Sequence, residues 1–596
     1  MTEVHPETWQ GRELTTLAGY HPGVAPLDEH NVKLLDNVHP IGWKPSASRR
    51  KRYNMVVLGA GAGGLVSAAG SAGVGAKVAI VEKHLMGGDC LNVGCVPSKA
   101  ILRCAHVVRE AKNAAEFGVD IPNVHVNFGK VMERMRTLRA NFSPTDSCDR
   151  FQNKLGVDVF QGHGAFTSPS TVEVNGETLS FATAVIATGA NARVPDTPGI
   201  NAVPYLTNVS FWNQTQLPER LLVMGSGPIG LELAQAMALF GSQVTVIERG
   251  NRIMGREDPD AAAVVHKQME RDGVHFMLNT TIDEFKLGTG DTVAAHVTQR
   301  GIKSLVVSDA LLVAVGRVPH VEGIGLEAAG VQYDLNKGIK VKDSLQTTAK
   351  HIFAVGDCCT MYKFTHAADF MARAVIRNAL FFGSAKMSEL VIPRATFTEP
   401  EVAAVGKSEA ELLEEEVTFE VVKLEMVEVD RAVLDGATEG FVKLLVKPKH
   451  GTILGATIVG SEAGNMISEI TVAMHASMKL GALAAVIHPY PTKVISHHCC
   501  CKDFYSPFYG QIVPVLQERT STPCTQDVAL VSETVCSLCL NMVTAGHCVT
   551  YMLRKVAACR ASVACSTCMS FINFHSIWVL SGAGRHKHVN CIGWGY

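Results

Sequence analysis

Two glycine-rich segments of the same design constrain this chain more than any other feature. In the first, Gly59, Gly61 and Gly64 lie between an apolar strand and a helix of small residues, and a second strand ends at Glu82. This spacing is the fingerprint of a βαβ unit that binds a dinucleotide. Gly59 is expected to make the tight turn, Gly61 to admit a pyrophosphate, and Gly64 to let the helix pack on the strand. Glu82 is expected to accept hydrogen bonds from ribose hydroxyls.

The second segment repeats the first without a gap. Gly225, Gly227 and Gly230 follow another apolar strand, and the strand after the helix ends at Glu248. In both segments the glutamate follows the first glycine by 23 residues. A single glycine fingerprint is weak evidence, whereas two in one chain predict two dinucleotide sites.

Two cysteines, Cys90 and Cys95, lie just beyond the first βαβ unit. In a regular helix, residues five apart are separated by roughly 7.5 Å along the axis, too far for a relaxed disulfide. Gly94 therefore predicts a tight turn between the sulfurs, and Pro97 with the apolar residues after it predicts a helix that begins at Cys95. Exposed amides and the helix dipole would stabilise a Cys95 thiolate.

If the pair is not redox-active, it is a structural disulfide or two buried free thiols. The neighbouring glycine motif disfavours both, because it places a redox-capable dithiol beside a redox cofactor site. Together with the second glycine motif, the pair indicates an electron-transfer enzyme that uses a flavin and a nicotinamide coenzyme.

Three later motifs extend the pattern. Thr188 and Gly189 follow an apolar strand, Asp357 ends the run Phe-Ala-Val-Gly-Asp, and residues 394–403 read Arg-Ala-Thr-Phe-Thr-Glu-Pro-Glu-Val-Ala. With the glycine fingerprints and the cysteine pair, these motifs resemble those of the pyridine nucleotide-disulfide oxidoreductase family of flavoproteins. The resemblance runs from about residue 53 to residue 492.

The resemblance implies an α/β fold with two Rossmann-like dinucleotide-binding domains, for FAD and NAD(P)H, and an α+β C-terminal dimer-interface domain. The chain has 596 residues, enough for several cores. The expected division is an N-terminal extension at 1–52, a split FAD domain at 53–206 and 325–388, an NAD(P) domain at 207–324, a dimerisation domain at 389–498, and a cysteine-rich tail at 499–596.

The resemblance also implies roles for single residues. Cys95 would be the flavin-proximal, charge-transfer sulfur and Cys90 the interchange sulfur that meets the substrate. Lys99 would pair with Glu232 close to the flavin ring, and Asp357 would hold the ribityl chain. The other expected cofactor-binding residues are Lys83, Gly88, Thr188, Gly189, Arg249 and Gly316.

The expected substrate depends on what faces Cys90. Disulfide-reducing members of the family carry a His-Pro-Thr segment whose histidine, from the partner subunit, protonates the departing thiolate. Here Tyr490 occupies that place and His488 lies two residues earlier. A tyrosine with a pKa of about 10 is a poor proton shuttle near neutrality, whereas a histidine near 6.5 is well matched.

The mercuric reductase branch of the family has tyrosine at this place, and Tyr205 matches a second tyrosine of that branch. A soft metal prefers two thiolates with phenol oxygens as weaker partners. We therefore expect Cys90, Cys95, Tyr205 and Tyr490 to bind Hg(II), or another soft metal, as a transient substrate. The alternative for both tyrosines is ordinary packing.

Two other functions stay open at this point. If His488 turns inward, the chain would reduce a small disulfide of the glutathione or lipoamide type. An incomplete partner-supplied half of the site would instead leave a low-turnover flavin- or metal-binding protein. Three departures from the mercuric reductase pattern count against efficient metal delivery: no cysteine precedes Cys90, no vicinal cysteine pair lies near the C-terminus, and no acidic residue follows Thr492 closely.

The tail differs from the rest of the chain. Eleven of the seventeen cysteines lie between Cys499 and Cys591, without a helical or strand period. Cys536, Cys539, Cys565 and Cys568 form two Cys-x2-Cys pairs, but the 25 residues between the pairs exceed a usual zinc-ribbon gap of about 15 to 20. An atypical end that replaces the family's final interface helix is favoured over a zinc site.

Charge and hydropathy bear on coenzyme, partners and location. Glu248 favours NADH, because a carboxylate repels a 2′-phosphate, whereas Arg249, Arg252 and the mercuric branch favour NADPH. By analogy with that branch, the balance tips slightly toward NADPH. A net charge of −2 and a pI near 6.9 give no reason to expect nucleic acid. No membrane span or export signal is evident. We expect a cytoplasmic homodimer, with an organellar stroma or matrix also open, that acts on a small-molecule or metal-ion substrate.

Overall fold

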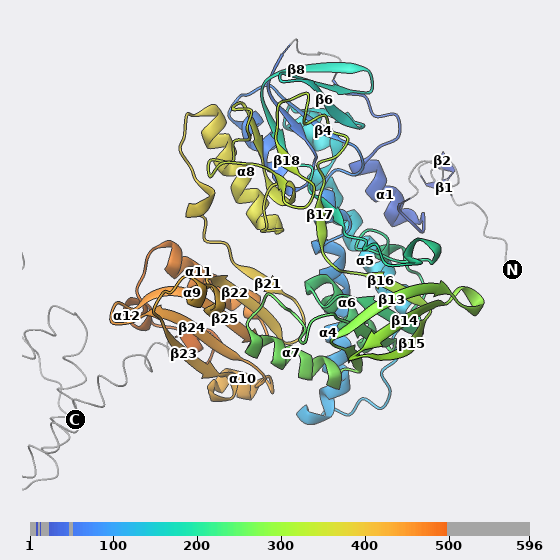
Figure 1. Ribbon diagram of the computed structural model, residues 1–596, viewed down its shortest axis with the longest axis vertical. Coiled ribbons are helices and arrows are strands. Elements are labelled where there is room, and N and C mark those ends of the chain that lie inside the picture. Colours follow the sequence, from blue (N-terminus) through green and yellow to red (C-terminus); the bar gives the residue numbers. More distant parts are fainter. Residues whose placement is uncertain (1–7, 10–11, 14–22, 47–51, 498–596) are drawn as a thin grey trace, which may run out of the picture. The chain divides into compact units, whose positions relative to one another are not determined.

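The computed structural model describes residues 8–9, 12–13, 23–46 and 52–497 (Figure 1). The first glycine motif lies in a sheet of seven strands with the order β5-β4-β3-β8-β7-β6, in which β20 also pairs with β8. β3, β4, β5, β8 and β20 are parallel where they pair with one another. The strands are β3 (Tyr53–Leu58), β4 (Val78–Glu82), β5 (Asp158–Gln161), β6 (Gly164–Ser168), β7 (Thr171–Val174), β8 (Glu177–Ile186) and β20 (Ile352–Ala354).

The late strand β20 shows how the chain returns to this sheet after a long insertion. The insertion holds a four-stranded parallel sheet, β12-β11-β10-β16, and a separate antiparallel sheet, β13-β14-β15. Both sheets belong to the second dinucleotide-binding unit. Their strands are β10 (Arg220–Met224), β11 (Gln243–Ile247), β12 (Val274–Met277), β13 (Thr280–Leu287), β14 (Val293–Gln299), β15 (Ile302–Ser308) and β16 (Ala310–Val313).

The third part of the described chain is an antiparallel sheet of five strands in the order β21-β22-β25-β24-β23. Helix α11 (Ala463–His475) packs on β22 and β25. The two parallel Rossmann-like sheets and this α+β part confirm the predicted fold class. The strands are β21 (Arg394–Thr396), β22 (Glu401–Gly406), β23 (Glu420–Glu425), β24 (Phe441–Lys447) and β25 (Thr452–Gly460).

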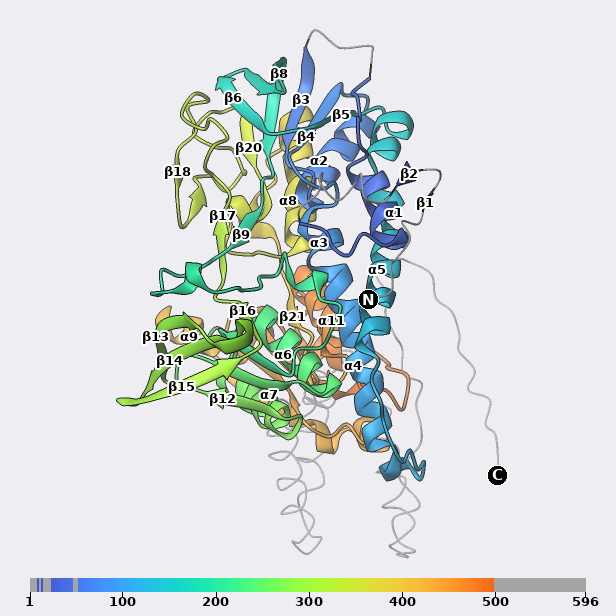
Figure 2. The same cartoon turned by 90° about the vertical axis from the view of Figure 1, so that its right-hand side faces the viewer.

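Six helices position the candidate site. Helix α4 follows α3 directly, and it packs against both α5 and α6, as Figure 2 shows. One buried core joins residues of α4, α5 and α6 with Val402, Phe441 and Val459 of the five-stranded antiparallel sheet. The part of the chain that contains this sheet is called the interface domain below. The six helices are α2 (Ala62–Gly73), α3 (Gly88–Asn92), α4 (Cys95–Asn113), α5 (Phe128–Phe142), α6 (Pro228–Phe240) and α8 (Thr365–Leu380).

Part of the segment that the sequence predicts to be an N-terminal extension packs on the rest of the chain. Helix α1 (Glu29–Val38) packs against α5, and its apolar face, with Leu34 and Leu35, joins the flavin-domain core. The buried Arg139 donates to Asn31 Oδ1 over 2.6 Å. Residues 23–46 therefore belong structurally to the first domain. The helix has an apolar face at helical spacing, but the sequence alone does not show that this face packs against α5.

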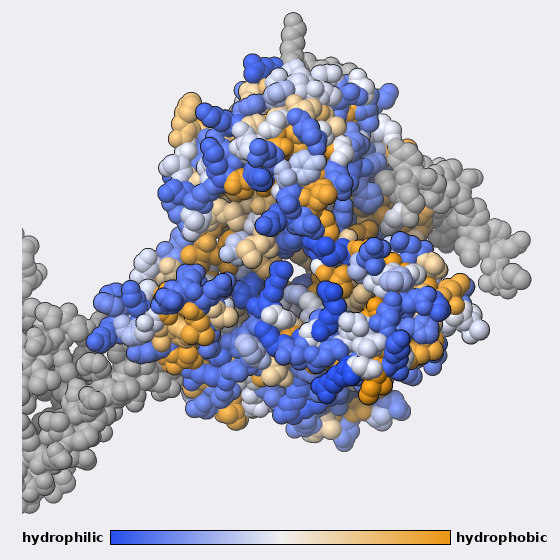
Figure 3. Space-filling model, viewed as in Figure 1, coloured by the Kyte–Doolittle hydropathy of each residue, from blue (hydrophilic) through white to orange (hydrophobic). Residues whose placement is uncertain are grey.

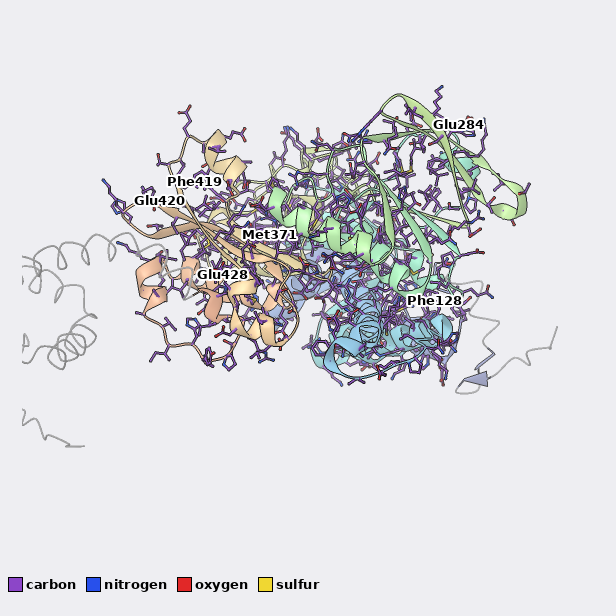
Figure 4. All side chains as sticks on the ribbon, turned by 90° about the horizontal axis from the view of Figure 1, so that it is seen from below. Phe128, Glu284, Met371, Phe419, Glu420 and Glu428 are labelled. Carbon is purple, nitrogen blue, oxygen red and sulfur yellow. The ribbon has the colours of Figure 1, made fainter. Side chains whose placement is uncertain are left out.

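Surface residues follow the expected division between core and solvent. Met371 of α8 and Phe128 of α5 are buried, whereas Glu420 and Glu428 project from the interface domain (Figure 4). Hydrophilic residues predominate on the face shown in Figure 3, with hydrophobic side chains scattered among them. Among the described residues, no helix is both long enough and apolar enough to cross a bilayer. The cysteine-rich tail, with Cys536, Cys539 and the other proposed zinc ligands, lies outside the described residues.

Candidate active site

The two cysteines lie on either side of a helix break. Cys90 is in α3, which ends at Asn92, and α4 begins at Cys95 as the sequence predicts. Gly94 permits the break, because a Cβ there would lie 2.8 Å from the Asp89 carbonyl oxygen. Both thiols are free; Cys90 is half-buried and Cys95 is exposed. The turn thus brings the sulfurs together, which one continuous helix would not allow.

The two thiols differ in their electrostatics. A hydrogen bond from Cys90, another from the Thr365 hydroxyl at 3.3 Å, and the charge of Lys99 lower the pKa of Cys95 to about 6. The same contact with Cys95, together with burial, raises the pKa of Cys90. Near neutrality the pair therefore consists of a Cys95 thiolate and a Cys90 thiol. A thiolate is the stronger electron donor and metal ligand.

Thr365 was not found from the sequence. It is the first residue of α8 and lies 270 residues beyond Cys95. In the sequence, Thr365 is marked only by its position shortly after the Asp357 motif. Its hydroxyl and the N-terminal end of α8 both favour negative charge at the Cys95 sulfur.

The pH dependence of Cys95 reactivity follows from this arrangement. Because only the thiolate is alkylated, the alkylation rate of reduced protein should rise with pH and reach half its plateau at about pH 6. Thr365→Val removes one hydrogen bond to the thiolate, so its midpoint should move to higher pH. Stopped-flow or mass-spectrometric alkylation between pH 4.5 and 9 measures both curves. The Cys95→Ser variant shows which part of the alkylation comes from Cys95. An unchanged midpoint in Thr365→Val would contradict the hydrogen bond between Thr365 and Cys95.

The expected ion pair near the dithiol is present. Lys99 Nζ lies 2.9 Å from Glu232 Oε2, and Lys99 is one helical turn beyond Cys95. The other carboxylate oxygen of Glu232 accepts from the Phe397 backbone N–H over 2.9 Å. The Phe397 ring centroid lies 4.2 Å from Lys99 Nζ. Phe397 belongs to the connection between β21 and β22, and the sequence did not mark it as a site residue.

In the first glycine motif, a stretch of backbone without side chains can approach a ligand closely. This stretch is called the cradle below. A Cβ on Gly59 would lie 2.4 Å from the Ala187 carbonyl oxygen, one on Gly64 would lie 1.9 Å from the Gly59 oxygen, and one on Gly88 would lie 2.5 Å from the Gly61 Cα. No side chain caps the N-terminus of α2, so its amides stay available as donors. These free amides fit the pyrophosphate of FAD.

Glu82 is buried and has a structural role in the same turn. Its Oε2 accepts from the Ala60 N–H at 2.7 Å and its Oε1 from the His84 N–H at 2.8 Å. Burial raises its pKa. The carboxylate therefore fixes the loop on both sides of the cradle, and its remaining lone pairs are the ones left for a ribose.

Asp357 is tied to the dithiol through an arginine that the sequence did not single out. Arg317 directly follows Gly316, and its Nε lies 3.3 Å from Asp357 Oδ2. Its Nη2 donates to the Asp89 carboxylate, next to Cys90. Burial raises the pKa of Asp357, and the charge of Arg317 opposes that rise. Arg317 thus joins the loop of the later flavin motif to α3.

The other residues expected to bind FAD lie around His320. The Thr188 hydroxyl donates to the His320 carbonyl oxygen over 2.7 Å, and Lys83 Nζ lies 3.0 Å from His320 Nε2. Gly189, with φ of 69°, adopts a left-handed conformation and has no atom within 4 Å of an added Cβ. These residues cluster near the carboxyl ends of β4 and β8, where ligands of parallel sheets bind.

The second glycine motif repeats the geometry of the first. A Cβ on Gly230 would lie 2.5 Å from the Gly225 carbonyl oxygen, whereas Gly227 has open space around it. No side chain caps the N-terminus of α6. Glu248 accepts from the Ser226 N–H at 3.1 Å and from the Gly250 N–H at 2.7 Å, as Glu82 does in its own turn. The motif fits a second dinucleotide.

Two arginines near Glu248 differ in how firmly the surrounding loop holds their side chains. Arg252 donates to the Met254 carbonyl oxygen over 2.9 Å and to the Gly255 oxygen over 2.8 Å. Arg249 is exposed. Of these two arginines, Arg249 can reach a 2′-phosphate without breaking the hydrogen bonds that Arg252 makes to the loop.

The C-terminal candidates lie on the interface domain. His488 is almost buried, with 5% of its side chain exposed, and its Nε2 lies 2.7 Å from Glu469 Oε1. His497 Nδ1 lies 2.5 Å from the other oxygen of Glu469. Tyr490 is 69% exposed, and its hydroxyl donates to Asp430 over 2.8 Å. Glu469 gave no sequence signal, because it precedes His488 by 19 residues on α11.

Tyr205 is half-buried against the core of the second dinucleotide-binding unit, beside Ile200 and Val203. It lies just before the isolated bridge that joins Leu206 to Leu312. Among the described residues, no group of three or more His, Cys, Asp or Glu side chains is arranged to hold a metal. A metal at the dithiol would therefore have the two cysteines as its ligands, with tyrosine as the other residue type expected from the sequence.

Residues 53–372 match the pyridine nucleotide-disulphide oxidoreductase family model, and residues 392–496 match the dimerisation domain of that family. The chain belongs to this family. Pyridine nucleotide-disulphide oxidoreductases use FAD and NAD(P)H, and two dinucleotide-binding motifs in one chain agree with two such cofactors. The dimerisation domain indicates a homodimer.

Relatives within the family have different activities. The chain is 32% identical to a mercuric reductase of Bacillus cereus over 440 residues, which is 74% of this chain and 69% of the relative. It is 33% identical to a dihydrolipoyl dehydrogenase of Geobacillus stearothermophilus over 442 residues, 73% of this chain and 93% of the relative. The solved Cu(II) complex of the HOCl-induced flavoprotein disulfide reductase RclA from Escherichia coli aligns with a TM-score of 0.67 at 27% identity, covering 74% of this chain and 98% of RclA.

Proposed function

We propose that this family member reduces a soft, thiol-binding metal ion, with Hg(II) as the best candidate, at Cys90 and Cys95. The observation that carries the proposal is the contrast between Tyr490 and His488. The tyrosine is exposed on the interface domain, whereas the histidine is almost buried and held by Glu469. The partner subunit would accordingly meet a phenol rather than an imidazole. The resemblance of the chain to mercuric reductases agrees with this proposal.

The chemistry of the dithiol fits a metal acceptor. The Cys95 thiolate supplies one soft ligand, and Cys90 becomes the second when the metal displaces its proton. When bound, the flavin supplies the electron pair that it receives from the nicotinamide coenzyme. Two-electron reduction turns Hg(II) into elemental mercury and leaves both sulfurs as thiolates. No proton has to reach a departing thiol, so this reaction does not need a histidine as general acid.

One specific contact favours a small disulfide as the acceptor instead. Glu469 orients His488 at 2.7 Å, as a carboxylate does for a histidine that acts as general acid. Dihydrolipoyl dehydrogenases are as similar to this chain as mercuric reductases are. For this alternative, His488 would have to become accessible to the substrate at the partner's Cys90.

An acceptor panel with purified holoenzyme separates the two. Coenzyme oxidation should be rapid with Hg(II) in excess thiol, with elemental mercury released, and slow with glutathione disulfide or lipoamide. Tyr490→Phe should lower the rate with Hg(II), and Tyr490→His should raise the rate with glutathione disulfide. Activity with disulfides alone would contradict the metal proposal. No coenzyme consumption with any acceptor would indicate the low-turnover alternative.

We expect NADH to be the preferred coenzyme. Glu248 is fixed by Ser226 and Gly250 where it would repel a 2′-phosphate, and Arg252 is engaged with backbone carbonyls. The ratio of kcat/KM for NADH to that for NADPH should be about tenfold or more, equivalent to about 1.4 kcal/mol. Glu248→Ala should reduce this ratio, and Arg249→Ala should lower only the NADPH value. A wild-type preference for NADPH would contradict this expectation.

A further inference from the structure

Phe397 contacts both members of the ion pair beside the redox dithiol. Its ring lies over the Lys99 ammonium at 4.2 Å, and its backbone N–H donates to Glu232 Oε1 over 2.9 Å. Lys99 in turn contacts the other oxygen of Glu232 at 2.9 Å. The three residues come from α4, α6 and the interface domain. One small contact therefore joins the three main parts of the described chain.

The Phe397 ring is backed by the interface domain. A Cβ on Gly464 would lie 3.5 Å from the ring atom Cε1, so the first turn of α11 packs directly behind the ring. The Gly464 N–H donates to Glu401 Oε2 over 2.8 Å, which fixes this turn to the start of β22. Helix α11 thus backs the ring on one side, while 37% of Phe397 is exposed.

The ammonium of Lys99 has two anionic neighbours. The Cys95 thiolate, one helical turn away, is stabilised by the charge of Lys99 and destabilised by that of Glu232. The Lys99 side chain is 38% exposed, so water competes for it as well. A cationic group placed over a phenyl face gains about 0.5–1 kcal/mol at a partly exposed site. That gain equals a two- to fivefold change in occupancy of one position.

We propose that Phe397 is a positioning residue whose ring holds the Lys99 ammonium at the redox centre. Its backbone N–H donates to one oxygen of Glu232, which leaves the other oxygen to pair with Lys99. The inference concerns the dithiol common to the family and holds for a metal or a disulfide acceptor.

The test compares Phe397→Leu with Phe397→Tyr in purified holoenzyme. Both variants keep the backbone N–H, and only the tyrosine keeps the aromatic face. In Phe397→Leu, acylation of Lys99, followed by peptide mass spectrometry, should be about two- to fivefold faster than in the wild type. The thiolate-to-flavin charge-transfer absorbance of the two-electron-reduced protein should weaken at a fixed pH. Phe397→Tyr should match the wild type in both measurements.

Neither measurement needs an electron acceptor, so the result does not depend on the metal proposal. Wild-type acylation and absorbance in Phe397→Leu would overturn the inference. Equal losses in the leucine and tyrosine variants would also overturn it, because they would indicate a packing role without a contribution from the aromatic face. If Phe397→Leu does not fold, Phe397→Met replaces it, since methionine fills a similar volume without a ring.

Discussion

Cys95→Ser should abolish reduction of every acceptor while the coenzyme still bleaches the bound flavin. The serine hydroxyl is neither a thiolate at neutral pH nor a soft metal ligand, and it cannot form a disulfide with Cys90. Removing a group that acts directly in the chemistry typically costs on the order of 10³-fold or more in turnover. Steady-state coenzyme oxidation and anaerobic flavin absorbance measure the two halves of the reaction separately.

Cys104→Ser is the matched control, because Cys104 is a half-buried free thiol on the same helix. It should retain wild-type turnover. Cys90→Ser should retain the Cys95 thiolate but lose the second sulfur, so it should fail with metal and disulfide acceptors alike. Residual turnover of Cys95→Ser within tenfold of the wild type would place the electron exit elsewhere in the protein.

Arg109→Met should destabilise the holoenzyme by about 3–5 kcal/mol, the usual cost of leaving one partner of a buried ion pair alone. Arg109 on α4 pairs with Asp272, and their side chains are only 13% and 8% exposed. Arg109 also donates to the Glu399 carbonyl oxygen over 3.1 Å. Gln235 donates to both Asp272 and Glu399, so this cluster again joins the three parts of the described chain.

Denaturation midpoints at one protein concentration measure the effect, because the midpoint of a dimer shifts with concentration. Arg109→Met combined with Asp272→Asn should recover more than half of the loss, since no buried charge then lacks a partner. Arg220→Met is the control: Arg220 pairs with Asp309 in a more exposed position, and its loss should change the midpoint little. Equal losses in the two single variants would contradict the burial argument.

Several features of the site could be predicted because they are local in the chain. The two glycine turns are dictated by positive φ angles and close backbone contacts at Gly59 and Gly225, where no other residue fits. The helix start at Cys95 follows from Gly94 and the apolar period after it. The pairing of Lys99 with Glu232 spans 133 residues, and only resemblance to a family made it predictable.

Other features could not be read from the sequence. Thr365, Arg317 and Phe397 lie far along the chain from Cys95, Asp89 and Lys99, with which they interact or share the site, and none has a distinctive local pattern. Glu469 pairs with His488 from 19 residues earlier in the chain, on α11, where no local pattern points to it. Helix α1 was also missed, because its packing on α5 depends on the surface that α5 offers.

The sequence by itself determined that this chain builds two dinucleotide cradles and a dithiol at a helix start. These features depend on backbone freedom and helix termini, which a few neighbouring residues control. The tertiary structure decided which distant groups stabilise the Cys95 thiolate, where the ammonium of Lys99 is held, and which of His488 and Tyr490 is exposed. Those outcomes depend on charge, burial and hydrogen bonds between distant residues, and only the folded chain brings these residues together.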